Sequence, residues 1–159
     1  MNTEDSENLA AKSLLLINGP NLNMVGLREP DIYGSKTLDG IVDELKEHAA
    51  IRGFNLVATQ SNSEGALVDA IQKSRDSVSF ILLNAGAYSH SSIAIRDALL
   101  AVAIPFIELH ISNVYSRESF RHRSLIADLA QGVIVGFGAH SYSLALEAAI
   151  HYLEDIRSD

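Results

Sequence analysis

Short apolar runs recur along the chain at intervals, and amphipathic segments separate them. The runs cover residues 14–17, 54–58, 80–83, 105–109 and 133–135. Each run is short and alternates only weakly between apolar and polar positions. That pattern predicts five β-strands buried on both faces of a sheet.

The segments between the runs repeat hydrophobic residues three and four positions apart, which predicts amphipathic helices. Thr37 is the predicted N-cap of the first helix. Ser61 and Glu64 match a capping box before the second helix, with Asn62 and Ser63 as alternative caps. The residues that mark the helices are Leu38, Ile41, Val42, Leu45 and Ala49; Leu67, Ala70, Ile71 and Ser74; Ile93, Asp97, Leu100 and Ala101; and Tyr142, Leu146, Ala149, Ile150 and Leu153.

Strict alternation of strands and helices predicts an α/β fold, a parallel sheet with helices on both faces. Five strands in 159 residues suit a flavodoxin-like doubly wound sheet of order 2-1-3-4-5. We expect residues 13–159 to form a single domain and residues 1–12 a flexible acidic N-terminal tail. In such sheets ligands bind at the carboxyl ends of the strands, near the switch point between strands 1 and 3.

Composition narrows the classes of partner. With 12 Lys and Arg against 20 Asp and Glu, the formal net charge is −8, which argues against nucleic acid or an anionic membrane as partner. The absence of cysteine removes disulfides, thiolate nucleophiles and Cys-ligated metals. The longest apolar stretch, residues 98–107, is about half a membrane span. The N-terminus lacks a signal-peptide pattern, so we expect a cytoplasmic protein.

A long connection, residues 18–34, follows the first predicted strand. It holds three glycines and two prolines, whereas βα connections are usually two to six residues long. It also carries Arg28 and Tyr33. Such a loop is typical of an active-site lid, although a surface loop with an exposed ion pair has the same pattern.

A second polar cluster follows the third strand. Asn84 stands where that strand is expected to end. His90, Ser91 and Ser92 come directly before a predicted helix, so any of them could simply cap it.

The third cluster begins within the fourth strand. A period of two places Glu108, His110 and Ser112 on one face. A carboxylate beside an imidazole fixes the imidazole tautomer and raises its basicity, which suits a proton donor. Two alternatives are a purely structural histidine and a metal site formed by Glu108, His110 and His90, although no metal-spacing motif is present.

Two arginines follow the same strand. Arg117 and Arg121 lie one helical turn apart and could converge on one anion. Solvated surface arginines are the alternative.

Taken in order, these clusters resemble the type II 3-dehydroquinate dehydratases, the class II dehydroquinase family. The resemblance runs from about Leu14 to Leu153. The segments that carry it are INGPNLN (17–23), REPDIYG (28–34), NSEGALVDAI (62–71), LNAGAYSHSSIAIRDAL (83–99), IELHISN (107–113) and RESFRHRS (117–124). The resemblance implies a hydro-lyase of the shikimate pathway and aromatic amino acid biosynthesis, which converts 3-dehydroquinate to 3-dehydroshikimate without metal, cofactor or Schiff base.

The resemblance also implies roles for individual residues. Tyr33 would be the base, as a tyrosinate, with Arg28 as its essential neighbour and Arg117 as a second candidate for its support. His110, supported by Glu108, would be the general acid. Asn21 would stabilise an enolate intermediate through a water. The implied substrate-binding residues are Asn84, His90, Asp97, Ile111, Ser112 and Arg121.

The family assembles as a homododecamer of trimers, so Asp97 would reach a neighbouring subunit's site. This chain departs from the common family pattern at Tyr115, at Ser141–Tyr142 and over residues 125–128. None of the implied roles falls on those positions. The alternative from another functional class is a flavodoxin-like module that binds a ligand or regulates without catalysis.

Overall fold

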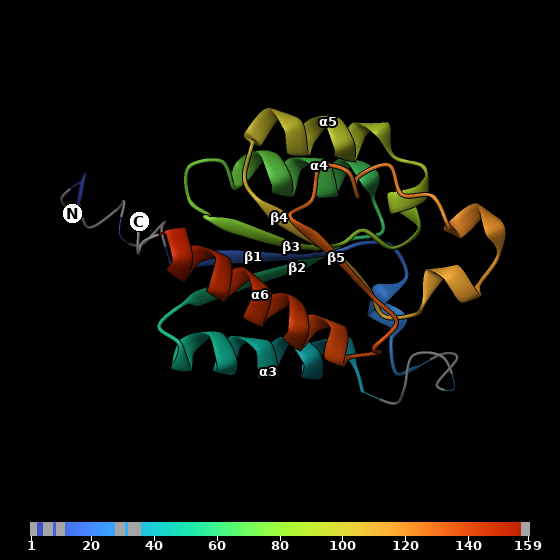
Figure 1. Ribbon diagram of the computed structural model, residues 1–159, viewed down its shortest axis with the longest axis horizontal. Helices are drawn as coiled ribbons and strands as arrows, with labels where there is room; N and C mark the ends of the chain where they lie inside the picture. Colours follow the sequence, from blue (N-terminus) through green and yellow to red (C-terminus); the bar gives the residue numbers. More distant parts are fainter. Residues whose placement is uncertain (1–2, 5–7, 9–11, 28–30, 32–35, 157–159) are drawn as a thin grey trace.

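The five predicted strands form one parallel sheet of order β2-β1-β3-β4-β5 in a computed structural model (Figure 1). The structure describes residues 3, 4, 8, 12–27, 31 and 36–156. The strands are β1 (Ser13–Asn18), β2 (Asn55–Gln60), β3 (Phe80–Asn84), β4 (Phe106–His110) and β5 (Gly132–Val135). The order confirms the flavodoxin-like doubly wound fold. Most of the predicted tail, residues 1–12, lies outside the described residues, so the tail stays a prediction.

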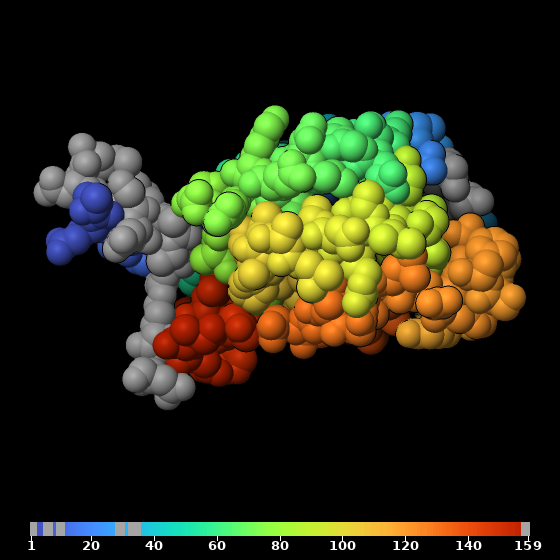
Figure 2. Space-filling model, turned by 90° about the horizontal axis from the view of Figure 1, so that it is seen from above, coloured from blue at the N-terminus to red at the C-terminus, as the bar shows by residue number. Residues whose placement is uncertain are grey.

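Four helices in the described part of the chain cover the two faces of the sheet. Helices α3 (Leu38–Ile51) and α6 (His140–Ile156) lie on one face, and α4 (Glu64–Lys73) and α5 (Ile93–Val102) lie on the other (Figure 1). Figure 2 looks onto the second face, where α4 and α5 lie side by side. Short 3-10 helices occupy the connections: η1 (Leu22–Met24), η2 (Gly86–His90), η3 (Val114–Ser116) and η4 (Ser119–Arg121). No helix in the described part of the chain has the length and apolar character needed to cross a membrane.

Helices on both faces explain the continuous apolar runs of the central strands. Along β1, Leu14 and Leu16 join the core under α3 and α6, whereas Leu15 and Ile17 join the core under α4 and α5. Burial on both faces was a wrong expectation for β2 and β5, where Val57 is 51% and Val133 43% exposed. These two are the edge strands of the sheet, so each has a neighbouring strand on one side only.

Serine or threonine residues cap α3, α4 and α5. Thr37 caps α3, as predicted, by accepting a hydrogen bond from the Gly40 N–H. The capping box at Ser61 is wrong, because Ser63 caps α4 instead. Ser92 caps α5, which decides between the three cap candidates before that helix.

Helix α5 is confirmed, but the residues that marked it in the sequence lie on its exposed side. Ile93 is 64% and Leu100 54% exposed, and Asp97 is exposed beside them. The buried residues of this helix are Ile95, Ala98 and Leu99. Because most residues of α5 are apolar, its pattern does not define a single buried face.

Candidate active site

A cavity of about 150 Å³ lies at the carboxyl ends of β3 and β4 and beside the connection after β1. This is the edge of the sheet where the doubly wound fold was expected to bind a ligand. Many of the predicted site residues line it: Asn21, Asn84, His90, His110, Ile111, Ser112, Arg117 and Arg121. The fold therefore gathers residues from three separate segments of the chain around one space.

Two other predicted site residues in the described part of the chain, Glu108 and Asp97, do not line the cavity. Glu108 is buried next to His110, where it contacts the imidazole rather than the open space. Asp97 lies on the exposed side of α5. Arg28 and Tyr33 lie outside the described residues, so their roles stay predictions.

A close backbone approach joins the connections that follow β1 and β3. The Gly19 N–H donates to the Asn84 carbonyl at 2.7 Å. A Cβ atom at position 19 would lie 2.3 Å from the Ala85 carbonyl oxygen, so only glycine fits there. Asn21 then adopts a left-handed conformation, with φ of 67°, and its N–H donates to Asn62 Oδ1 at 3.0 Å. This crossing places Asn21 at the cavity.

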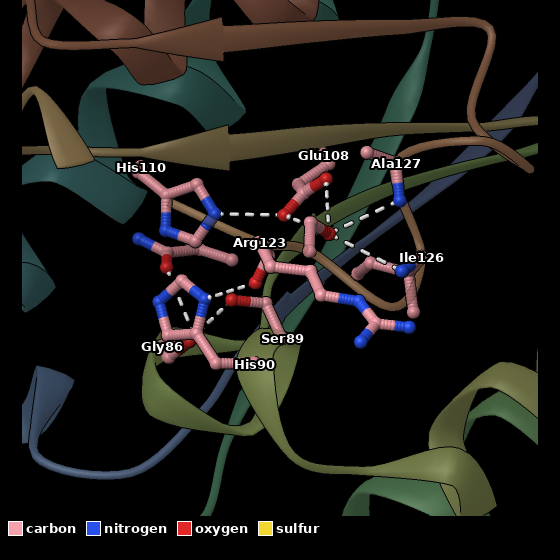
Figure 3. A network of polar contacts seen from close by, with 10 residues as sticks. Gly86, Ser89, His90, Glu108, His110, Arg123, Ile126 and Ala127 are labelled. Carbon is pink, nitrogen blue, oxygen red and sulfur yellow. Dashed lines mark hydrogen bonds and ion pairs between the residues drawn. The ribbon is translucent and has the colours of Figure 1, made fainter. Parts of the chain in front are cut away.

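Glu108 and His110 form a buried pair on one face of β4. His110 Nε2 lies 2.8 Å from Glu108 Oε1 (Figure 3). Glu108 is 1% and His110 6% exposed. A carboxylate oxygen accepts, so Nε2 donates the hydrogen, and Nδ1 is left without a hydrogen-bond partner among the described residues. The pair therefore leaves Nδ1 of His110, a residue that lines the cavity, as the ring nitrogen available to a ligand.

His90 lies parallel to His110 across the cavity wall. The ring centroids are 6.0 Å apart with an interplanar angle of 11°. His90 Nδ1 donates to the Arg123 carbonyl at 2.8 Å (Figure 3). His90 is therefore a cavity residue and not the cap of α5.

Tyr142, expected only as a core residue, contacts the site through Asn84. Its hydroxyl accepts from Asn84 Nδ2 at 2.9 Å and donates to Asn18 Oδ1 at 2.7 Å. Burial raises the pKa of Tyr142 above its ordinary value, although the hydrogen bond from Asn84 opposes the shift. The hydroxyl therefore stays protonated and remains a donor. The feature of the sequence that could have predicted this network is the asparagine at the end of each of two otherwise apolar strands, which are neighbours in the sheet.

The two arginines are held at the cavity and are not free surface groups. Arg117 Nη1 donates to Ser112 Oγ at 3.2 Å, and Arg121 Nε donates to Glu118 Oε2 at 2.6 Å. Their side chains are only 23% and 24% exposed. The hydrogen bond from Arg121, more than any other contact, lowers the pKa of Glu118. Both cations thus favour an anionic ligand at this position.

Metal ligation was the alternative for Glu108, His110 and His90. His110 Nε2 is used by Glu108, and His90 Nδ1 by a backbone carbonyl. Within residues 12–27 and 36–156 and the few other described positions, no group of three or more His, Asp or Glu side chains is arranged to hold a metal ion.

Comparison with known proteins agrees with this geometry. A family model described as dehydroquinase class II matches residues 12–150. A 3-dehydroquinate dehydratase of Prochlorococcus marinus (strain NATL1A) is 60% identical over 143 residues, which are 90% of this chain and 99% of that protein. A catabolic 3-dehydroquinase of Aspergillus clavatus is 58% identical over 144 residues, which are 90% of this chain and 96% of that protein.

Two crystal structures of type II dehydroquinases share the fold. The protein from Propionibacterium acnes matches with a TM-score of 0.84 at 39% identity, and the match covers 88% of this chain and 97% of that chain. The protein from Butyrivibrio crossotus matches with a TM-score of 0.84 at 43% identity, and the match covers 86% of this chain and 96% of that chain. Since both the sequence matches and the structural matches span nearly the whole domain, this chain belongs to the class II dehydroquinase family.

Proposed function

We propose that this protein is a hydro-lyase that dehydrates 3-dehydroquinate to 3-dehydroshikimate by way of an enolate. Membership of the dehydroquinase family supports the reaction and the substrate. The observation that carries the proposed chemistry is the buried Glu108–His110 pair, which opens into a cavity beside Arg117 and Arg121.

The reaction needs three groups. A base removes the proton from the carbon beside the ketone, and the electron pair of that C–H bond forms the enolate. Hydrogen-bond donors then stabilise the negative oxygen. As the enolate collapses, the C–O bond on the next carbon breaks, and an acid protonates the departing oxygen to release water. His110 is the proposed acid, since Glu108 holds its Nε2 and Nδ1 is left for the substrate.

Tyr33 is the proposed base, and Arg28 or Arg117 its supporting cation. An ordinary tyrosine, with a pKa near 10, is a poor base at neutral pH. A neighbouring guanidinium favours the tyrosinate. Arg117 supports this proposal because it lies at the cavity in the described part of the chain.

The remaining cavity residues suit a polyhydroxylated carboxylate. Ser112 lies two residues after the end of β4, where its hydroxyl and the neighbouring backbone N–H groups favour an anion, and Arg121 adds a cation. Asn84, His90 and Ile111 are proposed to hold the ring and its hydroxyls. Asn21 is proposed to orient a water on the enolate.

Self-association into a homododecamer of trimers is also proposed. Asp97 would reach the site of a neighbouring subunit. The supporting observation is that Asp97 lies on an exposed side of α5 together with the exposed apolar residues Ile93 and Leu100.

The deciding assay follows ultraviolet absorbance after addition of 3-dehydroquinate, because the product is a conjugated enone. We expect absorbance to rise with the wild-type protein. His110→Ala and Tyr33→Phe should lose turnover while retaining the fold, measured by circular dichroism, and substrate binding, measured by calorimetry. Substantial residual activity of Tyr33→Phe would contradict the assignment of the base.

Two treatments test the proposed absence of metal and imine chemistry. Prolonged chelation should leave the rate unchanged, and so should borohydride added in the presence of substrate. Binding of 3-dehydroquinate by the wild-type protein with no absorbance gain would instead support a ligand-binding module without catalysis.

A further inference from the structure

We propose that Ser124 is a positioning residue that holds the Glu108 carboxylate aimed at His110. This inference rests on the proposed role of His110 as the general acid. Ser124 lies in the loop after η4, 16 residues beyond Glu108 in the sequence.

The hydrogen bonds that Ser124 accepts leave only one direction in which its hydroxyl can donate. Its Oγ accepts from the Ile126 N–H at 3.2 Å and from the Ala127 N–H at 3.1 Å. A hydroxyl oxygen has two lone pairs, so these two donors occupy its acceptor capacity. The O–H then points to Glu108, whose Oε1 and Oε2 both lie 2.9 Å from Oγ. Ser124 therefore donates its hydroxyl hydrogen to the carboxylate.

Glu108 depends on such a donor because its other surroundings are apolar. It pairs in the sheet with Leu83 on β3 and Val133 on β5. Its side chain is 1% exposed, and a buried carboxylate without hydrogen bonds is strongly disfavoured. Among the described residues only His110 and Ser124 donate to it. Loss of Ser124 would leave the imidazole as the single donor.

Contact with both carboxylate oxygens also fixes the rotation of Glu108. Oε1 is shared by Ser124 and His110, and Oε2 is held by Ser124. The carboxylate plane is thereby set relative to the imidazole, which keeps the hydrogen on Nε2 and leaves Nδ1 for the substrate.

The segment that carries Ser124 is itself anchored from two elements. The Leu125 N–H donates to the Ser89 carbonyl of η2 at 2.8 Å. Arg96 of α5 donates to the Leu125 carbonyl at 2.7 Å and to both carboxylate oxygens of Asp128 at 2.5 and 2.9 Å. Residues 125–128, where the chain departs from the common family pattern, therefore have a defined position. A serine in a fixed segment is suited to orient its neighbour.

Other titratable groups face the pair but do not replace Ser124. His90 of η2 stacks on His110, and Arg117 and Arg121 line the cavity after β4. On the helix side, Arg96 of α5 is bound to Asp128. Within the described residues none of them forms a hydrogen bond or ion pair with Glu108. Their charges remain in the variants below, so any change reports on the hydroxyl.

The decisive variant is Ser124→Ala, with Ser124→Thr as the conservative rescue. Loss of a hydrogen bond to a charged group predicts a kcat lower by about 10- to 100-fold. KM should change less than about threefold, because Ser124 does not line the cavity. Without the donor the geometry of the coupled Glu108–His110 pair changes, so the pH profile of kcat should differ from that of the wild type. Threonine keeps the hydroxyl and should restore both kcat and the profile.

Ser63→Ala is the matched control, because Ser63 caps α4 and has no contact with Glu108. Both alanine variants lose a serine that accepts from the backbone, so a merely structural role of Ser124 predicts lower thermal stability and an unmoved pH profile in both. A Ser124→Ala enzyme with wild-type kcat and profile would overturn the proposal. So would a Ser124→Thr enzyme that folds but behaves like the alanine variant.

A spectroscopic readout separates this proposal from the proposed function. The ring ¹⁵N shifts of His110, assigned by their loss in His110→Asn, report which nitrogen carries the hydrogen. We expect a single Nε2–H tautomer in the neutral wild-type ring and a mixture in Ser124→Ala. The same tautomer in both proteins would overturn the positioning role, even if dehydration is confirmed. A tautomer change would support that role, even if the wild-type protein fails to dehydrate 3-dehydroquinate.

Discussion

Tyr142 links the ends of two neighbouring strands through one hydroxyl group. Tyr142→Phe would leave the Asn84 amide and the Asn18 carbonyl oxygen without this partner in a buried position. We expect the free energy of unfolding to fall by about 1–3 kcal/mol. KM should rise, because Asn84 lines the cavity and loses the contact that orients its amide. Urea unfolding and steady-state kinetics measure the two effects.

Tyr152→Phe serves as the matched control for that change. Tyr152 also lies on α6 and packs edge-on against Phe80 at 5.4 Å, but its hydroxyl has no hydrogen bond among the described residues. It should therefore leave stability and KM nearly unchanged. Equal effects of the two variants would contradict the special role of the Tyr142 hydroxyl.

At the level of single residues, the sequence pattern predicted contacts close in the chain better than distant ones. Alternation along a strand was enough to place Glu108 and His110 on one face. Ser124 and Tyr142 had no such periodic relation to Glu108 and Asn84. Their contacts depend on how loops and α6 return to the sheet, which no local pattern encodes.

The cap of α5 can be tested at the level of this secondary-structure element. Ser92 is 1% exposed and its hydroxyl accepts from the Ile95 N–H at 3.0 Å. We expect Ser92→Ala to lower the free energy of unfolding by about 1 kcal/mol, since the helix loses its cap. Ser91→Ala, which changes an exposed neighbour that does not cap the helix, should have almost no effect. Denaturant midpoints compare the two, and equal losses would contradict the assignment of the cap.

The Arg96–Asp128 ion pair joins α5 to the segment after η4, and the strength of this contact depends on pH. The hydrogen bond from Arg96, above all, lowers the pKa of Asp128. A carboxyl group whose pKa is lowered in the folded state stabilises the fold at a pH above its ordinary pKa of about 3.9. That contribution is lost as the pH falls through the lowered pKa. The melting temperature of Asp128→Asn should therefore lie below that of the wild type at pH 6.

The same difference should shrink in acid and in salt. At a pH well below the lowered pKa of Asp128 both proteins are uncharged at this position, so their melting temperatures should converge. Added salt should reduce the difference at pH 6, because the pair is exposed. A difference that persists unchanged in acid would show that Asp128 acts through something other than its charge.

At the scale of the whole molecule, the proposed assembly leads to a complementation test. His110→Ala subunits keep Asp97 but lack the proposed acid, whereas Asp97→Ala subunits keep the acid but lack the proposed neighbour contact. We expect each variant alone to have low turnover. Dissociation, mixing and reassembly should restore activity, because some sites then combine His110 of one chain with Asp97 of another. Light scattering should give a mass of about twelve chains of 17.2 kDa each.

Absence of recovery on mixing would contradict the proposed reach of Asp97 into a neighbouring site. The control is a mixture of His110→Ala with Tyr33→Phe. Both proposed roles belong to the same site of one chain, so this pair should not recover activity.

The net charge of −8 takes on a different meaning once the site is known. It still argues against polyanions, which contact a large surface. The proposed substrate is a small carboxylate that meets only the cavity, where Arg117, Arg121, His90 and His110 gather. The local field of the cavity, and not the total charge, governs its binding.

By itself the sequence determined the order of strands and helices, the doubly wound class, the family and most of the residues around the cavity. These depend on local periodicity, on short motifs and on the rule that parallel strands end at one edge. Only the tertiary structure decided which strands are edges, which face of α5 is buried, which serines cap the helices and which side chains hold Asn84 and Glu108. Those outcomes depend on contacts between residues far apart in the chain, whose geometry is set by packing the two cores around the sheet.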